Sequence, residues 1–572
     1  MKVLESRRLT GPSLLLDRPG AILDVSLGSL NPDRAALAWR EAAGHLLHAV
    51  GWPGEEVAWR AFEGGLSLAF SAPVDCLYAA TEVNEAAWRL AVAELAGEPA
   101  PGLEELVAEL RNRIGEERNQ ALVELHKTAR ARGLIFLVGE DLVSAGSGHG
   151  ALVWPAASLP DPSTVNWANI HDVPVALVTG SNGKTTVVRL LGAMVEAAGR
   201  RAGLTSTDGV TIGRTFLAEG DFSGPSGARA LLRNPDVETA ILETARGGML
   251  RRGLPIDRAD VAVVTNVAAD HLGEFGVESL SDLAEAKLLV AKALGPRGTL
   301  VLNADDPMLV ERSGRFQCRL IWFALDPSSP VVDRHVRAGG TAVVEQAGRI
   351  VLLEGKDRRI VTSVAEVPIT FGGTARHNVA NALAAIAGAS ALGLGIDHVT
   401  LALQRFGRDV ADNPGRANLW ELGGARILLD FAHNPHGMTA LVDVARALPA
   451  RRRLVLVGQA GDRNDEAIRE LARAAWTLQP DRVVVKEMDQ YLRGRALGEV
   501  PALLVDEFSR LGAAEKAISR VGPEIEGVRE ALNWARPGDL LVLAIHQDRG
   551  AVLELLSGLT ASNWHAGEPL PV

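Results

Sequence analysis

Cysteine is almost absent from the chain, which contains only Cys76 and Cys318 among its 572 residues. Two cysteines are too few for a disulfide framework. Their wide spacing also excludes the close pairs of cysteine-based metal sites and redox motifs. We therefore expect both to be unreactive residues of the protein core.

Long hydrophobic runs and a surplus of positive charge are missing as well. No stretch approaches the roughly 18 consecutive apolar residues of a membrane helix, and the N-terminus, MKVLESRRLTGPS, lacks the apolar run of a secretory signal. The cytoplasm is therefore the expected location. The formal net charge of −11 argues against a nucleic-acid partner, because binding to phosphates requires clustered Lys and Arg. Small molecules, or a cationic or mixed-charge polymer, are the expected partners.

At this length a single hydrophobic core is excluded, so we expect several domains. Residues 1–165 combine strand-like runs with helical periodicity between Leu103 and Arg132, which predicts an α+β N-terminal domain. The strand-like runs are SLLLD, LSLAF and LIFLVG. A passage with four prolines follows and disfavours helix, so the first domain boundary is placed there; these are Pro155, Pro160, Pro162 and Pro174.

From Val175 onward, apolar strands alternate with helical segments. This alternation predicts α/β architecture, with a parallel sheet wrapped by helices in a central domain of residues 166–411. The pattern resumes near Asp412 with ARILLDFAH, RLVLVGQ, DRVVVKE and DLLVLAIH. Residues 412–572 are therefore predicted to form a second, smaller doubly wound domain of Rossmann-like type.

A glycine-rich segment follows the first strand of the central domain and opens a helix. Its glycines allow backbone N–H groups to approach phosphate oxygens, and the helix N-terminus adds partial positive charge. Lys184 is placed to reach the terminal phosphates, and the Thr185 hydroxyl to hold magnesium. The strict phosphate-loop pattern has glycine at position 178, where this chain has Val178. The predicted nucleotide-binding residues are Gly180, Ser181, Asn182, Gly183, Lys184, Thr185 and Thr186.

The segment GSNGKTT resembles the phosphate loop of Mur ligases and folylpolyglutamate synthetase, which share the departure at position 178. Further blocks resemble the Mur-like half of cyanophycin synthetase; they include LETARGGMLRRGL, TNVAADHLGEFG, LNADDP, DFAHNPHG, GDRNDE and KEMDQYLRGRALGE. The resemblance covers nearly the whole chain from Val175, and the opening VLESRRLTGPSLLLD faintly resembles the N-terminal domain of that synthetase. Its ATP-grasp domain has no counterpart here, which implies that one of two ligase activities is absent.

The resemblance implies a magnesium site at the mouth of the central sheet. Glu243 ends the apolar strand TAILE, and His271 follows a second strand at the same edge, where ligands collect in open α/β sheets. By resemblance both bind magnesium, although a solvated strand-end carboxylate and a structural histidine are the plain alternatives. Lys287 corresponds to the lysine that Mur ligases carbamylate, with an ordinary surface lysine as the alternative and Lys292 as the rival position.

The resemblance also assigns residues to the nucleotide base and the terminal phosphate. The helix beginning at Arg376 matches a Mur segment whose histidine and asparagine contact adenine, which implies these roles for His377 and Asn378. Arg416 matches an arginine that binds the terminal phosphate when the domains close. A planar, permanently charged guanidinium suits that role.

The block DFAHNPHG implies that the C-terminal domain completes the catalytic site with Asp430, His433 and Asn434. Domain closure would exclude water from a labile acyl phosphate. A strand followed by a proline-containing turn is the alternative interpretation.

The implied activity is ATP-dependent ligation with ATP and Mg²⁺. The γ-phosphate passes to a carboxylate, and an amine attacks the acyl phosphate. In cyanophycin synthetase the Mur-like half joins arginine to an aspartate side chain, so an isopeptide bond is the leading hypothesis. Four acidic residues are candidates for binding a guanidinium, unless they are solvated loop charges; these are Asp462, Asp465, Glu487 and Asp489.

Two alternatives from other functional classes stay open. The chain is then either a non-catalytic scaffold that binds nucleotide and polymer beside a separate ATP-grasp protein, or a regulatory phosphate-loop ATPase. The scaffold is disfavoured because the candidate catalytic residues are present; these are Lys184, Glu243, His271, Lys287 and Arg416. Assembly into a homo-oligomer is compatible with the ligase, the scaffold and the ATPase hypotheses.

Overall fold

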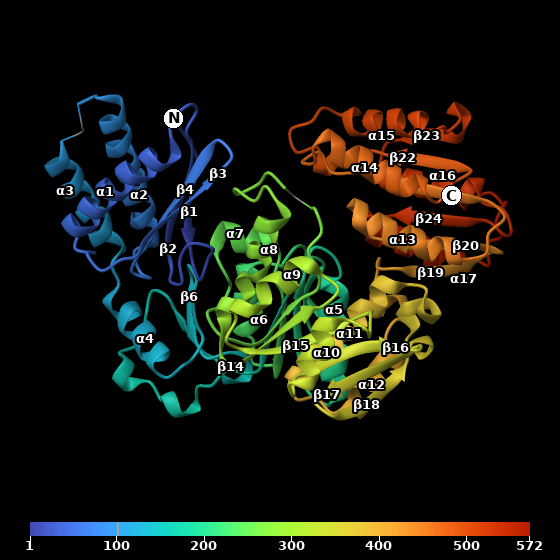
Figure 1. Ribbon diagram of the computed structural model, residues 1–572, viewed down its shortest axis with the longest axis horizontal. Helices are drawn as coiled ribbons and strands as arrows, with labels where there is room; N and C mark the ends of the chain where they lie inside the picture. Colours follow the sequence, from blue (N-terminus) through green and yellow to red (C-terminus); the bar gives the residue numbers. More distant parts are fainter. Residues whose placement is uncertain (100–101, 271, 572) are drawn as a thin grey trace. The chain divides into compact units, whose positions relative to one another are not determined.

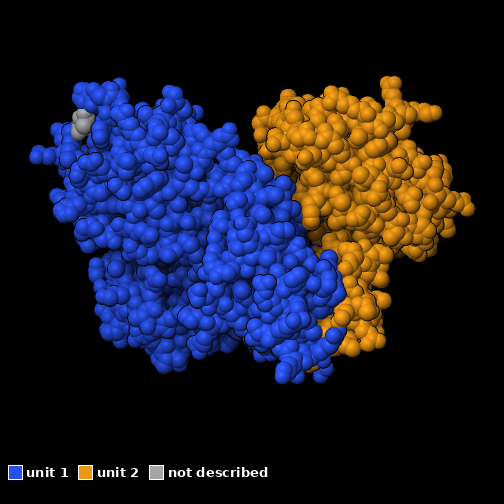
Figure 2. Space-filling model, viewed as in Figure 1, with its two compact units in different colours: residues 1–344, 352–358, 384–399 blue, residues 345–351, 359–383, 400–572 orange. Residues whose placement is uncertain are grey.

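A computed structural model describes residues 1–99, 102–270 and 272–571. The chain divides into two compact units, which Figure 2 colours separately. Unit 1 comprises residues 1–344, 352–358 and 384–399; unit 2 comprises residues 345–351, 359–383 and 400–572. The division into domains at residues 165 and 411 stays a prediction.

The N-terminal part of unit 1 is built on a four-stranded antiparallel sheet in the order β1-β2-β4-β3 (Figure 1). Its elements are β1 (Lys2–Leu9), β2 (Gly20–Ser26), β3 (Val57–Phe62), β4 (Gly65–Ser71), α1 (Pro32–Ala49), α2 (Leu77–Ala96) and α3 (Leu103–Glu117). Helices α1 and α2 pack on one face of the sheet, because their apolar stripes share a core with β2 and β4.

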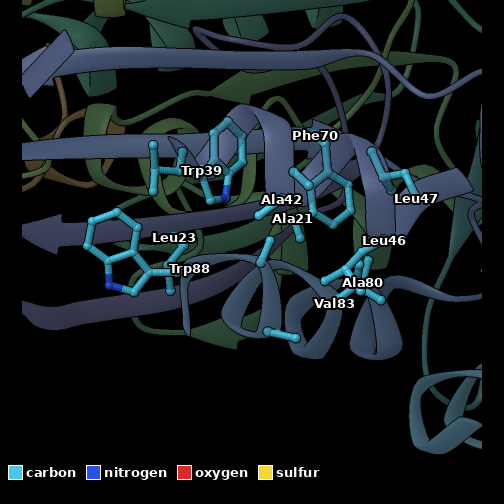
Figure 3. Close-up of a cluster of buried hydrophobic side chains, with 14 of the residues drawn as sticks. Ala21, Leu23, Trp39, Ala42, Leu46, Leu47, Phe70, Ala80, Val83 and Trp88 are labelled. Atoms are coloured by element: carbon cyan, nitrogen blue, oxygen red, sulfur yellow. The ribbon is translucent and has the colours of Figure 1, made fainter. Parts of the chain in front are cut away.

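The large aromatic side chains of Trp39, Phe70 and Trp88 lie in that core among smaller aliphatic residues, as Figure 3 shows. The indole nitrogen of Trp39 donates a hydrogen bond of 2.9 Å to the side-chain oxygen of Asn84, and the Asn84 amide donates to the carbonyl of Leu68. Asn84 is fully buried, so these bonds satisfy polar groups that would otherwise be costly to bury.

One expectation for this part is wrong. The run Ser13–Asp17 (SLLLD) is not a strand, because the Ser13 hydroxyl accepts backbone N–H groups of Leu15 and Leu16 and closes a turn. The helical periodicity between Leu103 and Arg132 is confirmed, and it forms two helices, α3 and α4 (Gln120–Ala131). An antiparallel sheet in the order β5-β6-β7 follows; its strands are Phe136–Val138, Leu142–Ala145 and Leu152–Pro155.

The two cysteines differ in environment. Cys76 is buried in the N-terminal core, where burial and the neighbouring Asp75 raise the pKa of its thiol to about 12. It is an unreactive core residue, as expected. Cys318 is only partly buried, so the expected core position is wrong for it.

The central sheet of unit 1 runs β11-β10-β9-β12-β8-β13-β14-β15-β16. All neighbours from β9 to β16 are parallel in this order, whereas β10 and β11 form antiparallel pairs at one edge. The strands are β8 (Val175–Thr179), β9 (Ala202–Ser206), β10 (Gly209–Ile212), β11 (Thr215–Glu219), β12 (Thr239–Glu243), β13 (Ala259–Val264), β14 (Leu294–Asn303), β15 (Arg319–Ala324) and β16 (Thr341–Gln346). The predicted parallel sheet is confirmed.

Helices alternate with these strands, as the sequence predicts for parallel pairing. They are α5 (Lys184–Ala197), α6 (Pro225–Leu232), α7 (Arg246–Arg252), α8 (Leu280–Leu288), α9 (Pro307–Arg312) and α10 (Pro330–Arg337). The chain continues through β17 (Arg349–Glu354), β18 (Asp357–Ser363), α11 (Arg376–Ala391) and α12 (Ile396–Arg405).

Unit 2 contains a six-stranded sheet in the order β19-β20-β24-β21-β22-β23. Only β19 and β20 pair antiparallel; the other neighbours are parallel. The strands are β19 (Asn418–Leu422), β20 (Ala425–Asp430), β21 (Arg453–Val457), β22 (Arg482–Lys486), β23 (Ile518–Val521) and β24 (Leu540–Ala544); the helices are α13 (Pro435–Ala447), α14 (Asp465–Trp476), α15 (Glu499–Arg510), α16 (Glu524–Trp534) and α17 (Arg549–Ala561).

Helices cover both faces of this sheet. Along β24, Leu540 and Val542 pack with α13, α14 and α15, whereas the alternate residues Leu541 and Leu543 pack with α16 and α17. The predicted doubly wound C-terminal fold is confirmed. Among the described residues, no helix has both the length and the apolar character needed to cross a membrane.

Candidate functional site

The phosphate loop connects β8 to α5 in unit 1. Gly180 has a φ of +149° and Gly183 a φ of +85°, so both adopt backbone conformations that favour glycine. A Cβ atom on Gly180 would lie 1.8 Å from the hydroxyl oxygen of Thr265, which follows the neighbouring strand β13. The helix begins at Lys184, so the loop ends at a helix N-terminus as the sequence predicts.

Side chains beyond the end of β13 hold the loop in place. The Thr265 hydroxyl donates to the carbonyl of Asn182 at 2.6 Å, and the Asn266 side chain accepts from the Asn182 amide at 3.0 Å. The Ser181 hydroxyl donates to the carbonyl of Ala268 at 2.8 Å. These bonds fix the loop conformation from a neighbouring strand, which preorganises it for an anion.

Lys184 folds back over the loop. Its amine donates to the carbonyls of Gly180 and Ser181 at 3.1 and 3.3 Å. The ammonium group therefore lies at the loop, where phosphate oxygens bind in proteins of this loop type.

Glu243 ends β12, which lies beside β8 in parallel register, with Glu243 opposite Val178. Its carboxylate accepts a 2.8 Å hydrogen bond from the Thr185 hydroxyl, and the residue is 2% exposed. The alternative of a solvated strand-end carboxylate is therefore wrong. A carboxylate beside a hydroxyl provides the hard oxygen donors that Mg²⁺ prefers.

The other predicted magnesium ligand, His271, lies outside the described residues. Within the described ranges, no group of three or more His, Cys, Asp or Glu side chains is arranged to hold a metal ion by itself. The predicted ligand set thus stays a prediction.

Lys287 lies near the C-terminus of α8 and is 3% exposed, so the surface-lysine alternative is wrong. Burial, followed by repulsion from Lys184, holds the pKa of its amine well below the usual value. Lys292 instead binds the N-terminal segment, donating to the Ser13 carbonyl and pairing with Asp17, both at 2.7 Å. The geometry favours Lys287 over Lys292 as a neighbour of the phosphate loop.

The two predicted adenine contacts lie in unit 2 and differ in environment. The Asn378 side chain is buried, donating to the Ile369 carbonyl at 2.9 Å and accepting from Asn381 at 3.0 Å. It therefore stabilises the start of α11. His377 is partly buried, and burial together with His436 lowers the pKa of its imidazole to about 4. The neutral ring is thus the form present at neutral pH.

Arg416 and Asp430 lie near each other in unit 2. The Arg416 guanidinium lies 4.1 Å from the centroid of Phe431. Asp430, at the end of β20, accepts the backbone N–H of Ala417 at 2.7 Å. Burial raises the pKa of the Asp430 carboxyl, and Arg416 opposes that rise. The structure therefore brings these two predicted residues together.

The next two residues of the predicted block have local partners. The Nδ1 atom of His433 lies 3.1 Å from the carbonyl of Phe431, so Nδ1 carries the proton and donates. Asn434 is the N-cap of α13 and accepts from the Gly437 amide at 2.8 Å. The segment DFAHNPHG therefore connects a strand to a helix, and it also carries His433.

A buried charged cluster at the end of β22 was not predicted. The Lys486 amine binds the Glu524 carboxylate and lies 3.0 Å from Nδ1 of His546. Since Nε2 of His546 lies 3.1 Å from the Ala432 carbonyl, Nε2 donates and Nδ1 accepts. Burial and Lys486 hold the pKa of His546 well below its usual value. A lysine ending the apolar strand RVVVK was the available sequence signal.

Three of the four acidic candidates for a guanidinium site already have partners. Asp462 pairs with Arg463 and Arg493 at 3.0 and 3.1 Å, and Asp465 with Arg495 at 2.8 Å. Glu487 is buried and accepts backbone N–H groups.

The fourth candidate, Asp489, is exposed and accepts from the Gln547 amide at 2.9 Å. Within the described ranges it belongs to no ion pair. Asp489 is therefore the candidate whose negative charge is least compensated.

Comparison with known families places these features in a common framework. The Mur ligase middle domain matches residues 178–389, and the Mur ligase glutamate ligase domain matches residues 415–544. The central and C-terminal parts of the chain belong to the Mur ligase family. The phosphate loop, Glu243 and Lys287 lie in the Mur ligase middle domain, and Arg416 and Asp430 in the glutamate ligase domain.

Curated relatives of this Mur ligase include cyanophycin synthetase from Synechocystis sp., which is 40% identical over 333 residues. That match covers 58% of this chain and 38% of the synthetase, so the chain spans about two fifths of the relative's length. A UDP-N-acetylmuramoyl-L-alanyl-D-glutamate–2,6-diaminopimelate ligase from Chlorobium phaeobacteroides is 27% identical, with 64% of this chain and 70% of the relative covered.

Among solved structures, E. coli FolC in complex with ADP, without folate substrate, has a TM-score of 0.51 and 18% sequence identity. The match covers 68% of this chain and 90% of FolC. At that identity the likeness concerns the fold alone, and it confirms the Mur ligase and FolC type of α/β fold.

Proposed function

We propose that this Mur ligase is an ATP-dependent, ADP-forming ligase that joins a carboxylate to an amine through an acyl phosphate. The preorganised phosphate loop, with Lys184 above it and the Thr185–Glu243 pair beside it, supports this proposal most directly. The relatives are a synthetase and a ligase by name. A carboxylate alone is too poor an acyl donor for an amine, so activation by ATP is the required chemistry.

The proposed reaction has two displacement steps. A carboxylate oxygen of the acceptor attacks the γ-phosphorus of ATP, and the bond to the bridging oxygen breaks to release ADP. The nitrogen of a neutral amine then attacks the acyl carbon, the bond to the phosphate oxygen breaks, and the amine loses a proton. Lys184 and the loop amides stabilise charge on the transferring phosphoryl group.

The donor atoms present fit Mg²⁺ at this loop. Thr185 and Glu243 would hold it, with His271 as the ligand predicted from sequence, and the bound ion would neutralise phosphate charge. The roles proposed for Arg416, Asp430 and His433 rest on the resemblance of their sequence blocks to Mur ligases.

Carbamylation of Lys287 is a further part of the proposal. A neutral amine reacts with CO₂, forming a carbamate and releasing a proton. Burial and the nearby Lys184 favour that neutral form. The product would place a negative charge beside Lys184, where the unmodified ammonium would be repelled.

For substrates, we propose an amino acid such as arginine and an aspartyl or similar carboxylate of a cyanophycin-like peptide. The identity to cyanophycin synthetases supports this class. Asp489 is the proposed contact for a guanidinium, because its charge is not used in an internal ion pair. A separate ATP-grasp protein as partner also belongs to this proposal.

The decisive experiment measures ADP release with each of the twenty amino acids and an aspartate-containing peptide acceptor, together with mass spectrometry of the product. We expect release only when both substrates are present, and loss of turnover in Lys184→Ala. Release without acceptor would support the regulatory ATPase. Absence of release with every combination would support the scaffold.

The carbamate is tested by removing CO₂. Turnover should fall in CO₂-depleted buffer and recover with bicarbonate, and Lys287→Ala should be inactive but partly rescued by acetate or formate. Lys292→Ala is the matched control and should keep its response to bicarbonate. Equal turnover with and without CO₂ would exclude a functional carbamate.

A further inference from the structure

Arginines from three elements gather beside the N-terminal sheet of unit 1. Arg8 lies on β1, Arg229 on α6 and Arg252 at the end of α7. The backbone N–H of Thr10 donates to the Arg252 carbonyl at 2.8 Å, which joins β1 to α7. The Arg8 guanidinium lies 3.5 Å from the centroid of the Tyr78 ring and is oriented by it.

Little negative charge compensates this group, which we call the arginine cluster (Arg8, Arg229 and Arg252). Glu140 approaches Arg8 only to 4.0 Å, is 81% exposed and already accepts from the Tyr78 hydroxyl. Within residues 1–99, 102–270 and 272–571, no carboxylate lies at ion-pair distance from Arg229 or Arg252. Neither guanidinium has a hydrogen-bond acceptor there either.

A structural role explains a neighbouring arginine but not the cluster. Arg233, one turn after Arg229 on α6, donates to the Ser144 hydroxyl at 3.2 Å and to the Leu142 carbonyl at 2.7 Å. It thereby fixes α6 to β6. Arg229 makes no such bond, although its side chain is partly buried.

The three charges also act on one another. Burial first, and then repulsion from Arg8 and Arg252, lowers the pKa of Arg229, and the weaker influence of Glu140 opposes that fall. Burial, Arg8 and Arg251 lower the pKa of Arg252, and the weaker influences of Tyr78 and Glu5 oppose that fall. Like charges held together without a partner destabilise a fold, so this arrangement is typical of a binding site whose ligand supplies the opposite charge.

We propose that the arginine cluster binds a carboxylate group of the acceptor substrate. This proposal rests on the ligase function proposed above, since it names the acceptor of that reaction. Guanidinium groups bind carboxylates through paired, parallel hydrogen bonds, and several converging forks would hold one carboxylate firmly.

Helix α7 relates the cluster to the phosphate loop within unit 1. Its first residue, Arg246, pairs with Glu274 and contributes to the electrostatics of Lys287, whereas its last residue is Arg252. Seven helical residues span roughly 9 Å. An acceptor with several carboxylates is long enough to span that distance, so we expect a poly-aspartate peptide to bind better than free aspartate.

Calorimetric titration of the full chain with tetra-aspartate, in the absence of ATP, tests the site directly. We expect the double variant Arg229→Gln/Arg252→Gln to bind the peptide at least about tenfold more weakly. Because these charges repel each other, its melting temperature should stay equal or rise. Arg214→Gln, at an exposed arginine in the turn between β10 and β11, is the matched control and should bind like the unaltered chain.

Unchanged affinity in the double variant would overturn the proposal. If the double variant melts at a lower temperature, Arg229→Lys/Arg252→Lys, which keeps the charges, decides: recovery of peptide binding supports the site, and no recovery overturns it. Inorganic phosphate that competes as tightly as tetra-aspartate would replace the carboxylate assignment by a phosphate site. If peptide binding depends on the arginine cluster but no ADP is released with any substrate, the ligase function would be contradicted. The carboxylate site would still be supported.

Discussion

At the scale of single residues, two buried lysines differ in the charge that lies beside them. Lys486 is fully buried with Glu524, and backbone N–H groups of His546 and Asp548 satisfy the same carboxylate at 2.8 Å. Lys287 is buried next to another lysine. Burial lowers the pKa of both amines, but Glu524 opposes that fall at Lys486, whereas Lys184 adds to it at Lys287.

Removing either Lys486 or Glu524 should therefore lower the stability of the fold considerably. Lys486→Met leaves the Glu524 carboxylate buried without its cation, and we expect the free energy of unfolding to fall by about 3–5 kcal/mol. Urea denaturation at neutral pH measures this change. Arg337→Met, which breaks an exposed pair with Asp333, is the control and should cost below about 0.5 kcal/mol. A loss for Lys486→Met as small as that of the control would contradict the buried pair.

A site residue could be predicted from sequence when the pattern that marks it lies in the neighbouring residues of the chain. Glu243 and Lys184 were predicted because each lies directly after a buried strand or loop of recognisable pattern. The cluster of Lys486, Glu524 and His546 was missed because its members come from three separate elements. Nothing in their spacing along the chain brings them together.

At the scale of elements, the phosphate loop depends on a close approach between two neighbouring strands. In Gly180→Ala, the new methyl group would collide with the Thr265 hydroxyl, which holds the loop through Asn182. We expect at least about tenfold weaker ATP binding and a stability loss of about 1–3 kcal/mol. Fluorescent nucleotide titration and urea denaturation measure the two effects.

Gly199→Ala provides the control at a second glycine of positive φ. Gly199 has a φ of +77°, and no atom lies within 4 Å of the position that its new methyl group would take, so the backbone cost is similar but no collision follows. It should leave ATP affinity unchanged. Equal ATP affinity in the two variants would mean that the loop tolerates the displacement of Thr265.

Helices and strands were predictable where a single hydrophobic pattern ran through the segment. Their ends were not predictable where a side-chain contact changed the course of the backbone. The alternating strands and helices after Val175 were correct because parallel pairing requires that order. The helical stretch between Leu103 and Arg132 is divided into two helices at Asn119, whose side chain caps α4 at 3.0 Å while its backbone N–H binds Asp75. That second contact joins residues 44 positions apart, beyond the reach of local periodicity.

At the scale of the whole molecule, two histidines with lowered pKa values make the stability of the fold depend on pH. His377 has a pKa lowered to about 4 from 6.5, and the pKa of His546 is also lowered. Below pH 6.5 the unfolded chain binds protons that the folded chain does not, so stability is lost as the pH falls from 6.5 toward 4.

Thermal unfolding between about pH 7.5 and about pH 4.5 should show this loss, at up to about 1.4 kcal/mol per pH unit for each histidine. His377→Asn should flatten the pH dependence, whatever its effect on stability at the upper end of that range. His398→Asn, on the surface helix α12, should leave the slope unchanged. An unaltered slope in His377→Asn would show that its proton affinity is the same in both states.

The contact between segments Thr10–Pro12 and Arg252–Leu254 has a consequence for how the chain is assembled. Backbone meets backbone there, since the Leu254 amide donates to the Pro12 carbonyl at 2.7 Å and a methyl group on Gly11 would lie 2.3 Å from the Leu254 carbonyl. Main-chain atoms form most of this contact, and the Thr10 hydroxyl adds one hydrogen bond of 3.2 Å to the Arg252 carbonyl. The contact should therefore be most sensitive to an increase in the size of Gly11. If the chain were divided after β7 and the two pieces were produced separately, each piece would keep its half of this backbone contact. The two pieces should then be able to associate.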